Sequence, residues 1–216
     1  MLQTSRKTGQ RENRRRCLTV AMTALSFTVG CVPSDPASAA LRALGLAGPD
    51  APATRWDHRP EAPVWTSAAT MAVASEDAAL ALRVPGDIAS FCPAYPDASL
   101  ADRRAFWVGL LSAIAKYESS ANPNASGGGG RYIGLMQISP LTATSYGCAA
   151  TSRAALQDGA ANLACAVRIV SYHVEKDAVV AGRGNRGAGR DWMPLRNSGK
   201  RGEIAAWVGQ QSYCKA

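Results

Sequence analysis

Residues 99–120 decide the fold of this chain, and they have the sequence SLADRRAFWVGLLSAIAKYESS. Ser99, followed three residues later by Asp102, matches an N-capping pattern and predicts the start of a helix. Two neighbouring lines of side chains at i, i+4, i+7 and i+11 spacing give that helix one broad apolar face. The lines are Phe106, Leu110, Ala113 and Tyr117, and Trp107, Leu111, Ile114 and Glu118. The helix therefore places an acid at the end of its buried face.

Glu118 is an expensive residue at such a position. Burial of an unpaired carboxylate costs several kcal/mol and favours the protonated form, and a helix C-terminus also disfavours negative charge. Both effects raise the pKa of Glu118, as a general acid working near neutral pH requires. The alternatives are a Glu118 exposed by fraying of the helix end, or one paired with an arginine. The sequence that follows favours the acid.

The segment after Glu118 ends the helix and leads into a glycine-rich loop. Pro123 cannot continue a helix, and Gly127–Gly130 allow the backbone to pass close to a ligand. Strand signals are limited to short runs such as Tyr132–Ile138, while the other apolar residues recur at helical spacing. We therefore expect a mainly α fold with at most a short β element around the glycine-rich loop.

Motifs on both sides of this loop resemble the soluble-type (SLT) lytic transglycosylase family. They are Glu118-Ser119, Asn122-Pro123, Gly134-Leu135-Met136-Gln137-Ile138 and Asp158-Gly159-Ala160-Ala161-Asn162-Leu163. The resemblance covers roughly residues 86–182, and the combination at this spacing is far more specific than the Glu-Ser pair alone. It implies a lysozyme-like fold and an enzyme that cleaves the glycan strands of peptidoglycan.

The resemblance also implies roles for individual residues. Glu118 is the catalytic acid, and Ser119 and Gln137 are candidate hydrogen-bond partners for the N-acetyl group or the sugar hydroxyls. For these two, the alternatives are local capping by Ser119 and solvent exposure of Gln137. Met136 and Tyr132 complete the candidate substrate-binding set, with Met136 expected to pack beneath the acid and Tyr132 to line the cleft. No cofactor and no metal ion are expected.

The acidic residues limit the chemistry, because no Asp or Glu lies between Glu118 and Asp158. Hydrolytic glycosidases generally use two carboxyl groups, about 5–5.5 Å apart or roughly 6.5–9.5 Å apart. The mechanism implied by the resemblance needs one. Glu118 protonates the oxygen between MurNAc and GlcNAc, the N-acetyl group stabilises the cationic centre, and Glu118 then deprotonates the 6-hydroxyl to give a 1,6-anhydro product. The alternatives are a hydrolytic muramidase with a remote carboxylate, such as Asp158 or Asp191, and an inactive peptidoglycan-binding lipoprotein.

The C-terminal part of the chain departs from the family pattern. Ala166 and Ile169 replace the usual Gly and Tyr of the third motif, and the expected Ala-Tyr-Asn block is absent. Residues 189–196 occupy its place, so no tyrosine is assigned to support the acid. Trp192 in this stretch is predicted to pack in the core in preference to stacking on a sugar. A helix is expected over residues 159–181.

Residues 1–31 are typical of an export signal, with a basic start and an apolar run over residues 17–30. The run ends in Thr28-Val29-Gly30-Cys31, which resembles a bacterial lipobox apart from Thr28. We favour lipidation of Cys31 and an outer-membrane anchor over simple cleavage after Ala39 or Ala40. Residues 32–54 predict an Ala/Pro-rich tether, and residues 55–216 a periplasmic catalytic domain.

The charge of the chain lies mostly in this signal. The net charge of +8 falls to +3 without residues 1–31, since 18 basic and 15 acidic residues remain. This balance gives little support to nucleic-acid binding. No stretch after residue 31 has the roughly 20 apolar residues of a membrane span, which excludes a polytopic membrane protein. We expect a monomer that binds peptidoglycan glycan strands.

Four cysteines lie after the signal: Cys92, Cys148, Cys165 and Cys214. An even number in an exported protein favours two disulfides, and the absence of a CxxC pair argues against zinc. Three pairings are possible. We favour Cys148–Cys165, because these residues are near neighbours around a helix–turn–helix, and Cys92–Cys214, which would attach the C-terminus to the core.

Overall fold

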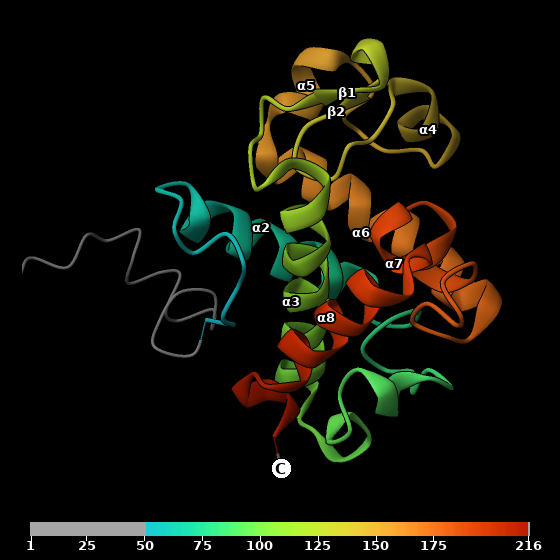
Figure 1. Cartoon of the computed structure of the whole chain (residues 1–216). Coiled ribbons are helices and arrows are strands. Elements are labelled where there is room, and N and C mark those ends of the chain that lie inside the picture. Colours follow the sequence, from blue (N-terminus) through green and yellow to red (C-terminus); the bar gives the residue numbers. More distant parts are fainter. Residues whose placement is uncertain (1–50, 216) are drawn as a thin grey trace, which may run out of the picture. The chain divides into compact units, whose positions relative to one another are not determined.

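The helix expected after Ser99 is present as α3, Leu100–Ser119, in the computed structural model of the chain, which describes residues 51–215. The Ser99 hydroxyl accepts a hydrogen bond from the backbone N–H of Asp102 at 3.1 Å, which confirms the predicted cap. All residues from Phe106 to Ala115 are buried. The middle of α3 is therefore covered on every side, and the helix forms the centre of the core (Figure 1).

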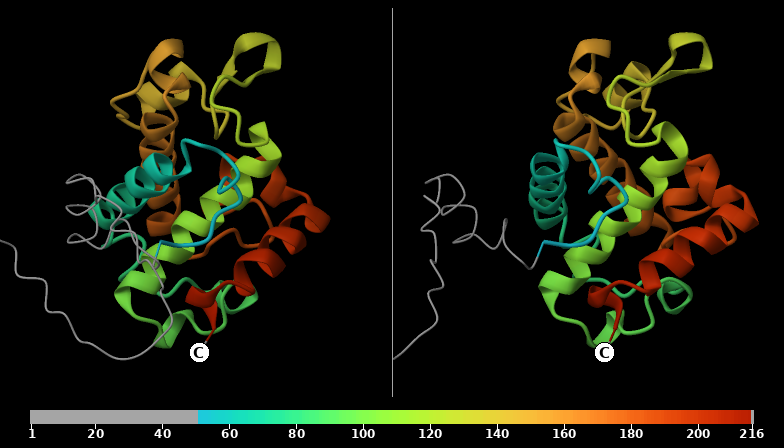
Figure 2. Two further views of the ribbon diagram at one scale, coloured as in Figure 1. Left: turned by 90° about the vertical axis from the view of Figure 1, so that its left-hand side faces the viewer. Right: turned by 60° about the vertical axis from the view of Figure 1, so that its left-hand side comes forward.

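Helices pack on two sides of α3. On one side, α2 (Ala62–Ser75) contacts both α3 and α6 (Gly159–Asp177). On the other side, α3 contacts α7 (Met193–Arg196) and α8 (Ser198–Gly209). Figure 2 shows α3 between the two groups. This arrangement fixes the central helix that carries Glu118.

A second group of short elements lies at the C-terminal end of α3 (Figure 1). Strands β1 (Ser126–Gly127) and β2 (Tyr132–Ile133) pair antiparallel, with the 3-10 turn η3 (Gly128–Gly130) between them. Helices α4 (Pro140–Ser145) and α5 (Arg153–Gln157) follow. The structure thus confirms a mainly α fold with a short β element at the glycine-rich loop.

The remaining short elements are 3-10 turns that connect the helices. They are η1 (Ile88–Ser90), η2 (Tyr95–Asp97), η4 (Gly187–Arg190) and η5 (Ser212–Cys214).

Helix α6 ends earlier than the sequence predicted. It was expected to extend to residue 181, but its last residue is Asp177, and Ala178 has a left-handed φ of 55°. The carboxylate of Asp87 accepts hydrogen bonds from three consecutive backbone N–H groups at residues 180–182. These bonds hold the chain in a non-helical path, so a distant acid and not the local sequence sets the end of α6.

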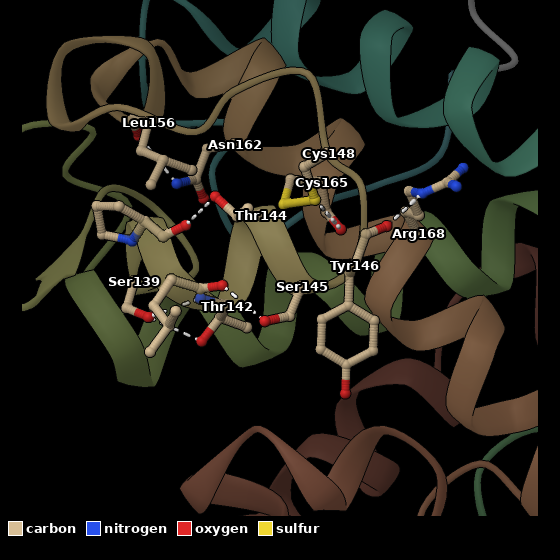
Figure 3. Close-up of a disulfide and its surroundings, with 12 residues drawn as sticks. Ser139, Thr142, Thr144, Ser145, Tyr146, Cys148, Leu156, Asn162, Cys165 and Arg168 are labelled. Carbon is tan, nitrogen blue, oxygen red and sulfur yellow. Dashed lines mark hydrogen bonds between the residues drawn. A yellow bond between two sulfur atoms is a disulfide. The ribbon is translucent and has the colours of Figure 1, made fainter.

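Both disulfides have the favoured pairing. Cys92–Cys214 joins residues 122 positions apart and attaches the C-terminus to the segment before α3. Cys148–Cys165 joins the end of the α4 region to α6 over 17 positions (Figure 3). Cys31, with its predicted lipid, lies outside the described residues.

The N-terminal signal and most of the predicted tether also lie outside the described residues. Thr54, assigned from the sequence to the end of the tether, is buried and donates its backbone N–H to the Asp57 carboxylate at 2.8 Å. The folded domain therefore includes Thr54. No helix within residues 51–215 is both long and apolar enough to cross a membrane.

The two disulfides should differ in their contribution to stability, because a crosslink between distant residues restricts the unfolded chain more than one between near neighbours. Replacing both Cys92 and Cys214 with Ala should lower the free energy of unfolding by roughly 4–5 kcal/mol. The same change at Cys148 and Cys165 should cost about 3 kcal/mol. Urea denaturation of the two double variants measures both values, and a larger loss for the second pair would contradict this account.

Candidate active site

Glu118 lies in the last turn of α3 and is half-buried. Burial raises the pKa of its carboxyl group to about 7, and the positive charge of Lys200 opposes this rise. The carboxyl group makes no hydrogen bond and no ion pair with any residue in 51–215. Near neutral pH it is therefore present in both protonated and ionised forms, as a group that both donates and accepts a proton requires.

Three other acids that could serve as a second carboxylate are each bonded to a group other than Glu118. Asp158 caps α6 by accepting the backbone N–H of Ala161 at 2.8 Å. Asp191 lies 2.6 Å from Nε2 of His173. Glu203 receives hydrogen bonds from neighbouring side chains on α3. Within the described residues, none of these carboxylates shares a hydrogen bond with Glu118.

The end of α3 is attached to the segment that carries the Gly-Leu-Met-Gln motif. Ser120 and Ala121 both have left-handed backbone conformations, with φ values of 53° and 57°, which turn the chain away from the helix axis. Ser119 donates its hydroxyl proton to the Leu135 carbonyl at 2.8 Å. This bond holds the residue next to Glu118 in place, so the Ser119 hydroxyl stabilises the helix end.

Gly134 begins a tight turn that few other residues could form. Its φ is 79°, and a Cβ atom there would lie 2.2 Å from the Leu156 carbonyl oxygen. Gln137 closes the turn with a φ of 49°, and its side-chain amide donates to the Gly134 carbonyl at 2.9 Å. Gln137 is half-buried, and this bond leaves its carbonyl oxygen and a second N–H for other partners.

Asn162 fixes this turn from the first part of α6. Its side chain is fully buried, its oxygen accepts the Met136 N–H at 2.9 Å, and its nitrogen donates to the carbonyls of Ile133 and Leu156. Trp192 completes the attachment, since its indole N–H donates to the Met136 carbonyl at 3.0 Å. Figure 3 shows Asn162 beside Leu156.

These two positioning roles were not predicted from the sequence. Asn162 was noted only as part of a motif, although a polar residue among the buried positions of α6 was a usable signal. Trp192 packs in the core as expected, with 2% of its surface exposed.

Two predicted substrate-binding residues differ in accessibility. Met136 is fully buried, so its side chain packs in the core, and the inclusion of this residue among the groups that touch substrate is not supported. Tyr132, on β2, is 41% exposed, and its ring covers Gly128, where a Cβ atom would lie 2.7 Å from Cδ2. Tyr132 is therefore available to a ligand, while Met136 belongs to the turn and its side chain packs in the core.

The described residues offer no cluster for a metal ion. Among the described residues, no group of three or more His, Cys, Asp or Glu side chains is arranged to bind a metal.

Comparisons with known proteins agree with this geometry. Residues 98–205, half of the chain, match the model of the transglycosylase SLT domain. A solved structure of a glutamate-to-glutamine mutant of the protein DslA is 28% identical with a TM-score of 0.67, and covers 74% of this chain and 96% of that one. The structures of wild-type DslA (form 2) and of a second glutamate-to-glutamine mutant are 27% identical to this chain, with TM-scores of 0.65. Each also covers 74% of this chain and 96% of its own. No curated protein matches the chain. The lysozyme-like fold predicted from the sequence is confirmed.

Replacement of Asn162 with Ala should destabilise the turn, because it removes a hydrogen bond to the buried Met136 N–H and the bonds to the carbonyls of Ile133 and Leu156, of which the Ile133 carbonyl keeps its bond from the Ile138 N–H. We expect the free energy of unfolding to fall by about 3 kcal/mol. Asn185→Ala, at an exposed loop position, should change it by less than about 0.5 kcal/mol. Urea denaturation of both variants tests this role, and equal small losses would show that Asn162 is dispensable.

The raised pKa of Glu118 makes stability depend on pH. The folded state binds the Glu118 proton more tightly than the unfolded state, whose pKa is 4.5, so this stabilisation is complete below pH 4.5 and is lost as the pH rises through about 7. Glu118→Gln cannot ionise. Relative to wild type, it should gain about 1–2 kcal/mol of unfolding free energy between pH 5 and pH 8. Denaturation curves at the two pH values measure this gain, and a pH-independent difference would contradict the raised pKa.

Proposed function

The chain belongs to the transglycosylase SLT domain family, whose members are lytic transglycosylases, and we propose that it cleaves the MurNAc–GlcNAc bond of peptidoglycan without hydrolysis. The observation that carries this proposal is the single half-buried carboxyl group of Glu118, with its pKa raised to about 7 and with no acidic partner among the described residues. One group with this pKa can serve as acid and then as base.

In the first step, protonated Glu118 gives its proton to the glycosidic oxygen as the bond to the MurNAc anomeric carbon breaks. The N-acetyl oxygen of the same sugar stabilises the positive charge on that carbon. In the second step, ionised Glu118 takes the proton of the 6-hydroxyl, and the oxygen of that hydroxyl bonds to the anomeric carbon. The product is a 1,6-anhydro sugar, and Glu118 ends in its starting form. No water molecule is consumed, so no second carboxylate is needed to activate one.

Neighbouring residues support the two steps by holding the substrate. Tyr132 is exposed beside the glycine-rich loop and offers a ring face and a hydroxyl to a sugar. Gln137 has a free carbonyl oxygen and N–H that suit the N-acetyl group. Ser119 can still accept a hydrogen bond while its proton is donated to Leu135. We assign these three residues to substrate binding.

We also propose that the protein acts outside the cytoplasm, because peptidoglycan lies there. The basic and apolar N-terminal pattern would direct export, and lipidation of Cys31 would anchor the domain to the outer membrane through the tether. The domain would act as a monomer and without a cofactor.

Replacement of Glu118 with Gln should lower the rate of strand cleavage by about 10³-fold, because the amide cannot donate the proton. The variant should remain folded, as judged by circular dichroism. Glu175→Gln removes an exposed glutamate of α6 and should retain full activity. The measurement is release of soluble fragments from purified sacculi.

Mass spectrometry of the fragments separates the two catalytic alternatives. Anhydro ends are one water lighter than reducing ends, and the proposal predicts anhydro ends. Reducing ends would identify a hydrolytic muramidase. If the wild-type protein releases no fragments at all, the result would favour an inactive binding protein.

A further inference from the structure

A group of cations lies next to Glu118 and takes no part in the proton transfers. The ring of Tyr117, the residue before Glu118, has two ammonium groups near it. Nζ of Lys116 lies 5.0 Å from the ring centroid, and Nζ of Lys200 lies 5.1 Å from it. Lys116 belongs to α3 and Lys200 to the first turn of α8. The two helices thus bring positive charge together beside the catalytic carboxyl group.

The acid that pairs with Lys116 is Glu203, and both of its oxygens are occupied. Oε1 accepts from Nζ of Lys116 at 3.1 Å and also pairs with the guanidinium of Arg55. Oε2 accepts from the Tyr117 hydroxyl at 2.9 Å. Lys200 forms no ion pair with any acid in residues 51–215. In the described part of the chain it therefore has no ion-pair partner.

The stability of α8 does not account for Lys200. The first turn of a helix favours acidic residues and disfavours cations, yet the first turn of α8, which begins at Ser198, contains Lys200 and Arg201 and no acid. Lys200 also opposes the raised pKa of Glu118. A solvated lysine would be tolerated at this exposed position, but its placement beside the acid and Tyr117 suits an anion supplied from outside the chain.

We propose that Lys200 is a specificity-determining residue that binds a carboxylate of the glycan strand next to the bond being cleaved. This inference rests on the proposed function. Each muramic acid residue carries a lactyl carboxyl group, which is either free or extended by a peptide with carboxylates of its own. A carboxylate seated on Lys200 supplies an ion-pair partner and cancels the unfavourable effect of the lysine on Glu118.

The test measures binding of strands to the full chain carrying Glu118→Gln, which should not cleave them. Three forms of one glycan preparation serve as probes: strands with free lactyl carboxylates, the same strands after conversion of these groups to amides, and strands that retain their peptides. Adding Lys200→Gln should weaken the binding of the strands with free lactyl carboxylates, or of the strands that retain their peptides, about fivefold. This is the effect expected for one solvent-exposed ion pair. Binding of the amidated strands should not change.

Two further variants show whether charge is responsible. Lys200→Arg should retain at least half of the preference for carboxylate-bearing strands, and the exposed Lys176→Gln should bind as the parent does. The preference should also weaken in concentrated salt. A loss confined to free lactyl strands would identify the lactyl group as the ligand, and a loss with peptide-bearing strands would identify the peptide. Equal losses on charged and amidated strands, or no loss on any strand, would overturn the role of Lys200.

The outcomes separate this inference from the proposed function. If wild type releases anhydro fragments and Lys200→Gln binds all strands as the parent does, the inference fails and the function stands. If strands bind with a preference that depends on Lys200, but wild type releases no anhydro fragments, the function fails and the inference stands. If no strand binds to the full chain, both fail.

Discussion

The structure depends on keeping one carboxyl group largely out of water at the end of a helix, with no ionised partner. Such a group is unfavourable when ionised, because burial opposes its charge and the helix end repels it. The cost is tolerable because α3 is covered along its middle and cannot easily move to expose Glu118. Its final turn is held by Ser119, whose hydroxyl is bonded to the Leu135 carbonyl. The rigid core thus maintains a protonation state that an exposed glutamate would not have.

The turn beside the acid is held from three directions. Ser119 contacts it from α3, Asn162 from α6, and Trp192 from the segment before α7. Each bond uses a backbone group of Leu135 or Met136, so the three surrounding side chains fix the path of the backbone in the turn. The chain lacks the Ala-Tyr-Asn block of related sequences, and among the described residues no tyrosine bonds to Glu118. Desolvation, rather than a supporting hydroxyl, therefore sets the pKa of the acid.

Local features of the sequence could be predicted, and contacts between distant residues could not. The cap at Ser99 and the apolar lines of α3 each follow from a few neighbouring residues. The end of α6 depends on Asp87, about 90 residues earlier in the chain. The sequence therefore predicts a helix that continues to residue 181, four residues beyond its observed end at Asp177. Asn162 acts through backbone groups of other elements, and its place among buried positions of α6 does not reveal which groups those are. The packing of Met136 follows from the gap-filling habit of methionine, but its complete burial depends on the whole core.

The central claim is that Glu118 is neutral for much of the time near pH 7, and a direct titration tests it. The side-chain carboxyl carbons of ¹³C-labelled glutamate can be followed by NMR against pH, and the Glu118 signal is identified by its loss in Glu118→Gln. We expect this carbon to titrate with a midpoint of about 7. A midpoint near the ordinary glutamate value of 4.5 would contradict the account, because the acid would then be ionised throughout the range in which it must donate a proton.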